Sequence, residues 1–155
     1  MTIPLVSIVI VNWNGESVLS DCLSSVFEQA YSNIEVIVVD NNSQDNSKAL
    51  IRKKFKKVIL IENEKNLGFA GGNNCAYRVA KGRYLLLLNS DTICTKQFLV
   101  TLVNLMERQK NVAVVQPKIL YQDNPGYKKN SINAIGAFFT YTGFCIILDM
   151  ARMQS

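Results

Sequence analysis

The sequence contains no histidine, and this absence narrows the chemistry that the chain can perform. Without histidine there can be no Ser-His or Cys-His nucleophile pair and no His-ligated metal site. Any acid or base in a reaction must therefore be a carboxylate, a lysine, a tyrosine or a cysteine. Cysteine is also sparse, because Cys22, Cys75, Cys94 and Cys145 are widely spaced and form no CxxC pair of the kind that binds zinc. We therefore expect free thiols in a reducing compartment.

We expect neither a secretion signal nor a membrane span at the start of this sequence. Residues 1–4 carry no basic side chain, and the apolar run after them is short and ends at Asn12, so it fits neither a signal peptide nor a membrane span. A length of 155 residues, with 48% hydrophobic and 19% charged residues, suits one globular unit with one core. We expect a cytoplasmic protein that can work at the inner face of a membrane.

Basic residues outnumber acidic ones by 17 to 12, and much of the excess lies at residues 52–57 and 128–129. Such runs are most often the solvated face of a helix. Anionic lipid headgroups, phosphate-bearing substrates and nucleic acid stay open as partners. Nucleic acid is the least favoured of these, because the basic residues are not interleaved with aromatic residues in a recognisable binding motif.

Four short apolar runs rich in Val, Ile and Leu end abruptly in polar residues. We predict strands at 6–11, 34–39, 58–61 and 84–88. Because these runs are continuous rather than alternating, we expect a parallel sheet that is buried on both faces. Helical periodicity between them predicts helices at about 16–29, from near 45 through 54, at 70–80 and at 96–109. This alternation predicts a Rossmann-like α/β fold with right-handed crossovers and helices on both faces of the sheet.

Beyond Val115 the pattern changes. Gln116-Pro117 interrupts the apolar run, and residues 123–126 carry a strong turn signal. The stretch 134–150 is apolar and aromatic but is broken by glycines and threonines, which favours a β-hairpin over a spanning helix. A membrane-facing patch is the alternative interpretation of this stretch.

The residues that follow each predicted strand are small and polar. They are Asn12-Trp13-Asn14-Gly15, Asp40-Asn41-Asn42-Ser43, residues 66–74 and Asn89-Ser90-Asp91. Each segment alone can be explained as a turn before a helix, and Trp13 as a core aromatic. In an open parallel sheet, however, ligands bind beyond the carboxyl ends of the strands. Four unrelated turns would not all be expected to place amides, carboxylates and glycines at the same edge, so we predict one polar site there.

A nucleoside diphosphate would explain the four segments together. Its base needs hydrogen bonds at its edge and an apolar surface on its face, which Asn12, Trp13, Asp40 and Asn41 can supply.

The phosphates would be bound by the other two segments. Glycines before a helix let backbone N–H groups approach a pyrophosphate, which predicts this role for Gly71 and Gly72. These glycines match neither the dinucleotide fingerprint nor a P-loop. The carboxylate of Asp91 can hold a Mg²⁺ or Mn²⁺ ion, which keeps several waters and needs only one or two protein carboxylates.

The four segments, with the strand residues before them, resemble the successive motifs of family 2 glycosyltransferases, especially of the rhamnosyltransferase-like branch. The matching stretches are residues 6–15, 38–43, 66–74 and 87–91, in the family's order and spacing over about residues 4–120. The resemblance implies a GT-A fold that is incomplete at its C-terminus. It makes residues 1–120 a nucleotide-sugar-binding subdomain and residues 121–155 the start of an acceptor-side region.

The resemblance also assigns roles to further residues. It implies that Asn14, Asn73 and Ser90 belong to the donor site, and that Asp91 closes a metal-binding motif of the DxD type. Asn89 stands where many members have the first Asp of that motif, which implies that metal ligation rests on Asp91 alone. Asn41 stands where other branches have an Asp that contacts the base, which leaves UDP and dTDP open as the donor nucleotide.

An inverting transferase of this family uses an Asp or Glu in a later acidic motif as its general base. The carboxylates after Asp91 are Glu107, Asp123 and Asp149, and none lies in such a motif. We therefore expect that the chain stops before the catalytic base, and that alone it binds the donor with little or no transfer. The apolar stretch 134–150 would then lack partners and favour self-association.

The leading hypothesis is a glycosyltransferase domain of the hexosyltransferase type. It would transfer sugar from a UDP- or dTDP-sugar to a saccharide or lipid-linked acceptor in polysaccharide or glycolipid synthesis. The alternative is a non-catalytic module that binds a nucleotide sugar. A sugar nucleotidyltransferase is disfavoured, because residues 12–15 are not a Gly-rich loop with Arg and Lys.

Overall fold

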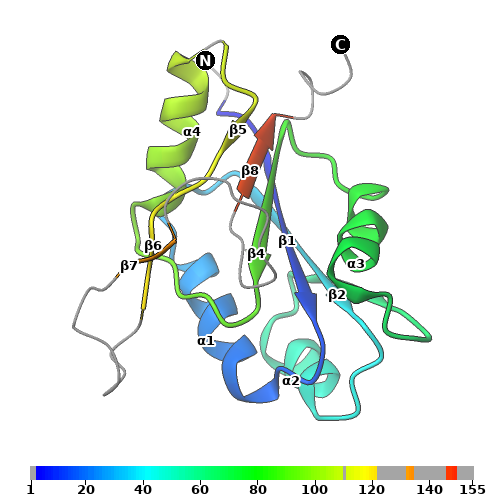
Figure 1. The fold of residues 1–155 in the computed structure, drawn as a ribbon. Coiled ribbons are helices and arrows are strands. Elements are labelled where there is room, and N and C mark those ends of the chain that lie inside the picture. Colours follow the sequence, from blue (N-terminus) through cyan, green and yellow to red (C-terminus); the bar gives the residue numbers. More distant parts are fainter. Residues whose placement is uncertain (1–2, 110, 122–131, 135–145, 150–155) are drawn as a thin grey trace.

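The computed structural model describes residues 3–109, 111–121, 132–134 and 146–149. Strands and helices alternate in the first part of the chain: β1 (Val6–Asn12), α1 (Glu16–Phe27), β2 (Ile34–Asp40), α2 (Ser47–Lys54), β3 (Ile59–Glu62), α3 (Gly68–Tyr77), β4 (Tyr84–Asn89) and α4 (Phe98–Arg108). Short strands follow: β5 (Val114–Val115), β6 (Ile119–Leu120), β7 (Ile132–Ala134) and β8 (Ile146–Asp149). Figure 1 shows this arrangement.

The main sheet is mostly parallel, as predicted. Its strand order in the described residues is β3-β2-β1-β4-β8-β5. β1 pairs in parallel with β2 on one side and with β4 on the other, and β3 pairs in parallel with β2. The continuous apolar runs of these strands account for this arrangement, because alternate side chains of each strand enter different cores on the two faces.

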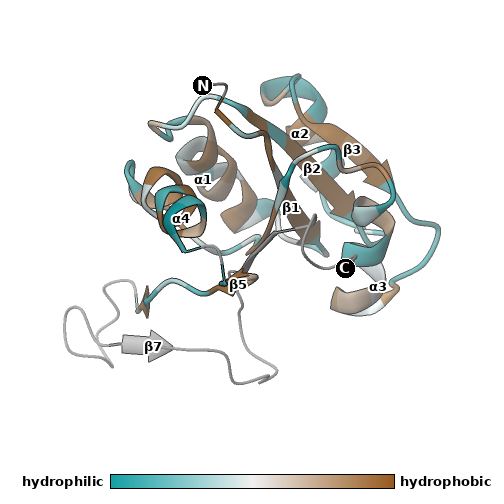
Figure 2. Cartoon of the chain, turned by 90° about the horizontal axis from the view of Figure 1, so that it is seen from above, coloured by the Kyte–Doolittle hydropathy of each residue, from teal (hydrophilic) through white to brown (hydrophobic). Residues whose placement is uncertain are grey.

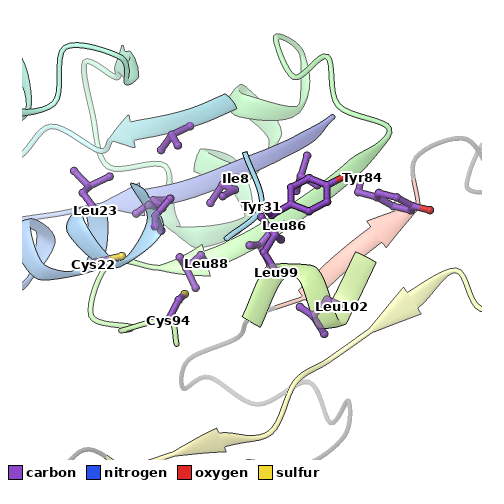
Figure 3. Close-up of a cluster of buried hydrophobic side chains, with 14 of the residues drawn as sticks. Ile8, Cys22, Leu23, Tyr31, Tyr84, Leu86, Leu88, Cys94, Leu99 and Leu102 are labelled. Atoms are coloured by element: carbon purple, nitrogen blue, oxygen red, sulfur yellow. The ribbon is translucent and has the colours of Figure 1, made fainter. Parts of the chain in front are cut away.

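Helices cover both faces of the sheet, which confirms the predicted α/β class (Figure 1). On one face, Leu23 of α1 and Leu99 of α4 belong to the larger buried cluster together with Ile8 and Leu86 of the sheet (Figure 3). On the other face, Ala76 of α3 packs with a smaller cluster of strand residues. Figure 2 shows the brown, apolar strands β1 and β2 between α1 and α4 on one side and α3 on the other.

The region after residue 115 differs from the prediction. β8 pairs antiparallel with β4 and with β5, whereas β7 pairs with β6 in a separate two-stranded sheet. Most of the β-hairpin predicted over 134–150 lies outside the described residues, which here are Ala134 and 146–149; these two ends belong to different sheets, and β8 pairs with β4. The physical reason is that β4 would otherwise present unpaired backbone N–H and C=O groups at its edge, which the apolar run in β8 satisfies.

β8 comes from the region that the sequence assigned to the acceptor side, yet it lies within the sheet of the α/β part. The division of the chain at residue 120 into two subdomains stays a prediction. Among the described helices, none combines the length and the apolar character that crossing a membrane requires.

The amino edge of the sheet is held together by a hydrogen-bond network around Ser7. Its hydroxyl donates to the Glu35 carboxylate at 2.5 Å and accepts from the Gly82 N–H at 2.8 Å. The Lys81 N–H also donates to Glu35, at 2.6 Å. The turn before β4 therefore lies directly against β1, and a methyl group at Gly82 would come within 2.5 Å of the Ser7 backbone nitrogen.

Candidate functional site

The carboxyl ends of the parallel strands meet at one edge of the sheet, as predicted from the sequence. Asn12 at the end of β1 lies opposite Asp40 at the end of β2. On the other side of β1, Val11 lies opposite Asn89, the last residue of β4. The loops that leave these strands therefore start side by side.

Asn12 and Asp40 form the buried centre of this edge. The Asn12 side-chain nitrogen donates to Asp40 Oδ2 at 2.9 Å and to the Ser43 hydroxyl at 3.1 Å. The Ser43 N–H donates to Asp40 Oδ1 at 2.8 Å, and Lys48 Nζ lies 4.0 Å from the same oxygen. Because both side chains are fully buried and engaged with other residues of the chain, they shape the loops around them. Their direct contact with a base stays a prediction.

Asn41 connects β2 to the start of α3. Its side-chain nitrogen donates to the Gly68 carbonyl at 3.0 Å, and its side-chain oxygen accepts from Asn63 at 2.8 Å. The residue is only 2% exposed. Both ends of the amide thus have a partner within the protein, so Asn41 holds the start of α3 against the end of β2.

The loops after β1 and β2 are fastened to each other. The Asn14 N–H donates to the Ser43 hydroxyl at 2.9 Å, and the Asn14 side-chain oxygen accepts from the Gln44 N–H at 2.8 Å. Asn14 and Asn42 have φ of 52° and 63°, a backbone conformation that asparagine tolerates better than most residues. This contact fixes Asn14 at the surface of the site.

The N-termini of α1 and α2 cap each other. The Glu16 N–H at the start of α1 donates to Asp45 Oδ2 at 2.8 Å. In return, the Asn46 N–H at the start of α2 donates to the Glu16 carboxylate at 3.1 Å. Neither helix has a side-chain cap from its own N-cap residue. Each carboxylate therefore satisfies a free helix N–H and lies at the positive end of a helix dipole.

This exchange of caps makes stability depend on the charge of Asp45. Partial burial raises its pKa, but hydrogen bonds from Ser47 and from the Glu16 N–H outweigh that effect and hold the pKa below its ordinary value of 3.8. A depressed folded-state pKa means that the stabilisation is present above the ordinary value and is lost as pH falls through the folded-state pKa.

We expect Asp45→Ala to lower the free energy of unfolding by about 1 kcal/mol at neutral pH, because two helix caps are weakened. The difference from the wild type should shrink as the pH falls below the ordinary pKa of the carboxyl. Thermal melts of both proteins at pH 7 and at acid pH measure this difference in stability. Asp21→Ala, at an exposed position of α1, is the control and should leave both melting temperatures nearly unchanged. A loss of stability that is the same at both pH values would contradict the role of the charge.

Trp13 follows the last residue of β1 and is 60% exposed. It is therefore not a core aromatic, which was the alternative explanation for it. Its indole ring offers an apolar face at the site edge, the feature that a flat heterocycle needs for stacking.

Ser90 and Asp91 form the turn directly after β4. A methyl group at Gly15 would lie 3.6 Å from the Ser90 hydroxyl, so this turn lies beside the loop after β1. Asp91 is exposed, and its carboxylate forms no hydrogen bond or ion pair with any residue that the structure describes. Its charge is thus available to a ligand.

The single carboxylate of Asp91 fits a cation that takes most of its ligands from water and from the bound substrate. Within the described residues, no group of three or more Cys, Asp or Glu side chains could hold a metal. A Mg²⁺ or Mn²⁺ ion at Asp91 would take its remaining ligands from phosphate oxygens and water, as these ions commonly do.

The glycines of α3 lie further inside the helix than predicted, because the helix begins at Gly68 and not near residue 70. α3 begins at Gly68, so the N–H groups of Gly71 and Gly72 fall where the helix's own hydrogen bonds begin. The reason for a glycine at 72 is packing: a methyl group there would come within 2.8 Å and 2.9 Å of the two Val11 methyls. Phosphate contact at the start of α3 stays a prediction, and it falls to the first turn of the helix.

Two buried acceptor oxygens at this edge have no hydrogen-bond partner in the described part of the chain. They are Asn12 Oδ1 and Asn73 Oδ1. The Asn73 side-chain nitrogen donates to the Phe69 carbonyl at 2.9 Å, which fixes the direction of its amide. Buried polar atoms are nearly always paired, so these two oxygens are unusual, and Asn12 Oδ1 lies directly against Gly15, where a methyl group would come within 2.3 Å of it.

Two of the three later acidic residues, Glu107 and Asp149, belong to parts of the backbone away from this edge. Glu107 of α4 accepts a hydrogen bond from the Tyr84 hydroxyl and pairs with Arg83 at 3.0 Å. Asp149 lies opposite Tyr84 in the sheet, and Tyr84 is the first residue of β4, so both acidic residues are placed at the amino edge. Asp123 lies outside the described residues. A catalytic base beyond this chain stays a prediction.

The described cysteines are free thiols; Cys22 and Cys94 are buried, whereas Cys75 is partly exposed. Cys22, Cys75 and Cys94 form no disulfide, and Cys145 lies outside the described residues. Burial, and after it the nearby Cys94, raises the pKa of Cys22 to about 12. Burial likewise raises the pKa of Cys94 to about 11. Neither buried thiol is therefore a nucleophile at neutral pH.

Sequence reasoning missed three residues that organise the site. Asn63, Glu16 and Asp45 make hydrogen bonds across loops, and none of them lies in a strand-end motif. One signal was available: two carboxylates each stand beside a predicted helix start, where acidic side chains are favoured. Each carboxylate caps the helix that the other one precedes or begins, and this exchange depends on tertiary structure.

A comparison with protein families matches residues 7–151 to the family described as Glycosyl transferase family 2. Among curated proteins, the Escherichia coli UDP-Glc:alpha-D-GlcNAc-diphosphoundecaprenol beta-1,3-glucosyltransferase WfaP is 36% identical over 107 residues, which cover 68% of this chain and 43% of WfaP. The chain thus spans less than half the length of that relative.

Two solved structures share the fold. S. aureus TarS 1–349 superposes with a TM-score of 0.76 at 20% identity, over 96% of this chain and 48% of that chain. TarS 1–349 has also been solved in complex with UDP-GlcNAc. The mannosyltransferase PcManGT from Pyrobaculum calidifontis, in complex with GDP-Man and Mn²⁺, superposes with a TM-score of 0.69 at 24% identity, over 73% of this chain and 35% of that chain.

Proposed function

Because this chain belongs to glycosyl transferase family 2, we propose that it binds a nucleoside diphosphate sugar at the carboxyl edge of β1, β2 and β4. Its mostly parallel sheet with helices on both faces is the GT-A fold. The observation that carries the proposal is that an exposed aromatic ring, an unpaired carboxylate and two unpartnered buried acceptors gather at one edge of this sheet.

The base would stack on Trp13, the exposed ring at the end of β1. Asn14, held by the loop after β2, lies next to Trp13 and can hydrogen-bond to the base or the ribose. Both ends of the Asn41 side-chain amide already have a hydrogen-bond partner. In this proposal Asn41 therefore holds α3 in place and does not hydrogen-bond to the base. We favour UDP over dTDP, because the names of WfaP and of the TarS complex contain UDP-sugars.

The diphosphate would lie between the turn after β4 and the first turn of α3. Asp91 would hold a Mg²⁺ or Mn²⁺ ion, which supplies positive charge to the departing nucleoside diphosphate. The PcManGT complex contains Mn²⁺ with its donor, which supports this choice of ions. Ser90 and the free N–H groups of the first turn of α3 would orient the phosphate oxygens.

The reaction that we propose is inverting transfer of the sugar. The acceptor hydroxyl loses its proton to a general base and attacks the anomeric carbon, while the bond to the diphosphate breaks. WfaP is named for an acceptor on diphosphoundecaprenol, so we propose a lipid-linked acceptor and work at the cytoplasmic face of a membrane. The rhamnosyltransferase-like branch, suggested by the sequence motifs, stays a prediction.

A non-catalytic module that binds a nucleotide sugar is the second candidate. The observation in its favour is the position of Glu107 and Asp149 at the amino edge of the sheet, opposite the donor site. Steady transfer of radiolabelled sugar by the purified chain would exclude this candidate.

Thermal melting with nucleotides tests donor binding without requiring catalysis. A ligand that binds only the folded state at one hundred times its Kd stabilises it by about 2.7 kcal/mol. For a domain of this size, that corresponds to a rise in Tm of roughly 5–10 °C. We expect UDP with Mn²⁺ to give the largest rise, and UDP without metal, dTDP and GDP to give smaller ones. If none of the three nucleotides raises Tm with or without Mn²⁺, the proposed function is wrong.

A further inference from the structure

A basic patch lies outside the proposed donor site, between α2 and β3. It consists of Lys53 and Lys54 in the last turn of α2, and of Lys56 and Lys57 in the link to β3. All four residues are exposed, and none forms an ion pair with a residue in the described ranges. Their neighbour Arg52 differs, because it pairs with Glu62 at 2.5 Å. The patch therefore presents four uncompensated positive charges within five residues.

Apolar surface lies next to these charges. Phe55, between the two pairs of lysines, stacks on Phe27 at the end of α1, with ring centroids 6.0 Å apart and planes 12° from parallel. Phe27 is 37% exposed, and Ile59, two residues beyond Lys57, is 41% exposed. Positive charge beside exposed apolar side chains is the combination that binds at the boundary between lipid headgroups and acyl chains.

Helix capping explains only part of the patch. Lys53 and Lys54 lie where basic residues interact favourably with the negative end of a helix dipole. Lys56 and Lys57 follow the C-cap residue Phe55 and lie outside the helix. A further explanation is needed for the charges beyond the helix.

The position of the patch leaves the donor site open. β3 is the outermost strand on its side of the described sheet, and the patch borders it. α2 begins beside the site, where Glu16 caps it, and reaches the lysines at its other end. A flat surface in contact with the patch would therefore not cover the loops after β1 and β4.

We propose that this basic patch docks the protein on a membrane surface rich in anionic phospholipid. The choice of a membrane rests on the proposed function, since a lipid-linked acceptor places the reaction at such a surface. Lysines near an anionic bilayer are attracted to it individually, and the attraction falls off within a Debye length. The uncompensated charges and the adjoining apolar side chains match this partner.

Vesicle co-sedimentation tests the proposal. One set of vesicles contains phosphatidylglycerol and phosphatidylcholine in equal amounts, and the other contains phosphatidylcholine alone. We expect the wild-type chain to bind the first set at low salt and to be released at high salt. The patch variant, with Lys53→Gln, Lys54→Gln, Lys56→Gln and Lys57→Gln, should bind the anionic vesicles at least about tenfold more weakly.

A matched variant separates the effect of losing the patch from the effect of lowering the net charge. Lys81→Gln, Lys96→Gln, Arg108→Gln and Lys118→Gln remove the same charge from exposed positions elsewhere. This variant should keep most of the binding, and an equal loss in both variants would overturn the proposal. Wild-type binding that is no stronger to anionic than to neutral vesicles would overturn it as well. If the fourfold patch variant does not fold, Lys56→Gln with Lys57→Gln, outside any helix, should still weaken binding severalfold.

Two further measurements distinguish membrane docking from nucleic-acid binding and from donor binding. If double-stranded DNA binds through the same lysines and displaces the vesicles at equal phosphate concentration, the patch is a nucleic-acid surface and the membrane proposal is wrong. The patch variant should keep the wild-type rise in Tm with UDP and Mn²⁺, because no lysine of the patch lies in the donor site. Donor binding without vesicle binding would therefore overturn the docking proposal while leaving the proposed function intact.

Discussion

Gly82→Ala is expected to lower the melting temperature of this protein by roughly 10 °C, a loss of about 3 kcal/mol. The added methyl group would lie 2.5 Å from the Ser7 backbone nitrogen and 2.8 Å from the Tyr84 carbonyl oxygen. These are backbone atoms of paired strands, so they cannot move aside as the end of a flexible side chain could. The turn before β4 would have to shift, and the hydrogen bond from Gly82 to the Ser7 hydroxyl would weaken.

The adjacent residue provides the control. Lys81 is exposed, and its contact with Glu35 is made by the backbone N–H, so Lys81→Ala should change the free energy of unfolding by less than about 0.5 kcal/mol. Thermal melts of the two variants measure the contrast. If Gly82→Ala has the same melting temperature as the wild type, the turn can accommodate a methyl group and this prediction is wrong.

The second large effect concerns ligand binding. We expect Asp91→Asn to weaken UDP binding in the presence of Mn²⁺ by at least about tenfold, since even the loss of an outer-shell partner costs metal sites 10–100-fold. UDP affinity without metal should be nearly unchanged. The melting temperature without ligand should also be unchanged, because the Asp91 carboxylate makes no hydrogen bond or ion pair in the described structure. Titration calorimetry with and without Mn²⁺ measures the two affinities, and a thermal melt without ligand measures the melting temperature.

Asp21→Asn, on the exposed surface of α1, makes the same change of charge outside the site. It should leave the Mn²⁺-dependent affinity at the wild-type value. If the two variants behave alike, the metal is bound elsewhere, and Asp91 is an ordinary turn residue.

The main part of the fold and the position of the site could be predicted from local patterns. The residues of β1, β2 and β4 are mostly apolar and do not alternate with polar ones, which is typical of strands buried on both faces, and parallel strands place their carboxyl ends at the same edge. For that reason Asn12, Asp40 and Asp91 could be assigned to one edge without knowing any distance. The exposed state of Trp13 could not be decided, because an aromatic residue after a strand can face either way.

What could not be predicted depends on partners distant in the sequence. The burial of Asn12 is tolerated because Asp40 and Ser43, about thirty residues away, accept its hydrogen bonds. The pairing of β8 with β4 follows from the open edge of that strand, whereas the composition of residues 134–150 fits a hairpin equally well. Gly72 gives the same sequence signal whether it approaches a phosphate or, as here, a neighbouring strand.

The late entry of β8 into the sheet has a consequence for biosynthesis. β5 and one edge of β4 have β8 as their described neighbour, yet about thirty residues separate β5 from β8 along the chain. At a translation rate of about 5–20 residues per second, these edges stay open for some seconds after β5 has left the ribosome. During that interval the nascent chain presents a row of unsatisfied amides that another nascent chain can pair with, so this is the stage at which chaperones have most to protect.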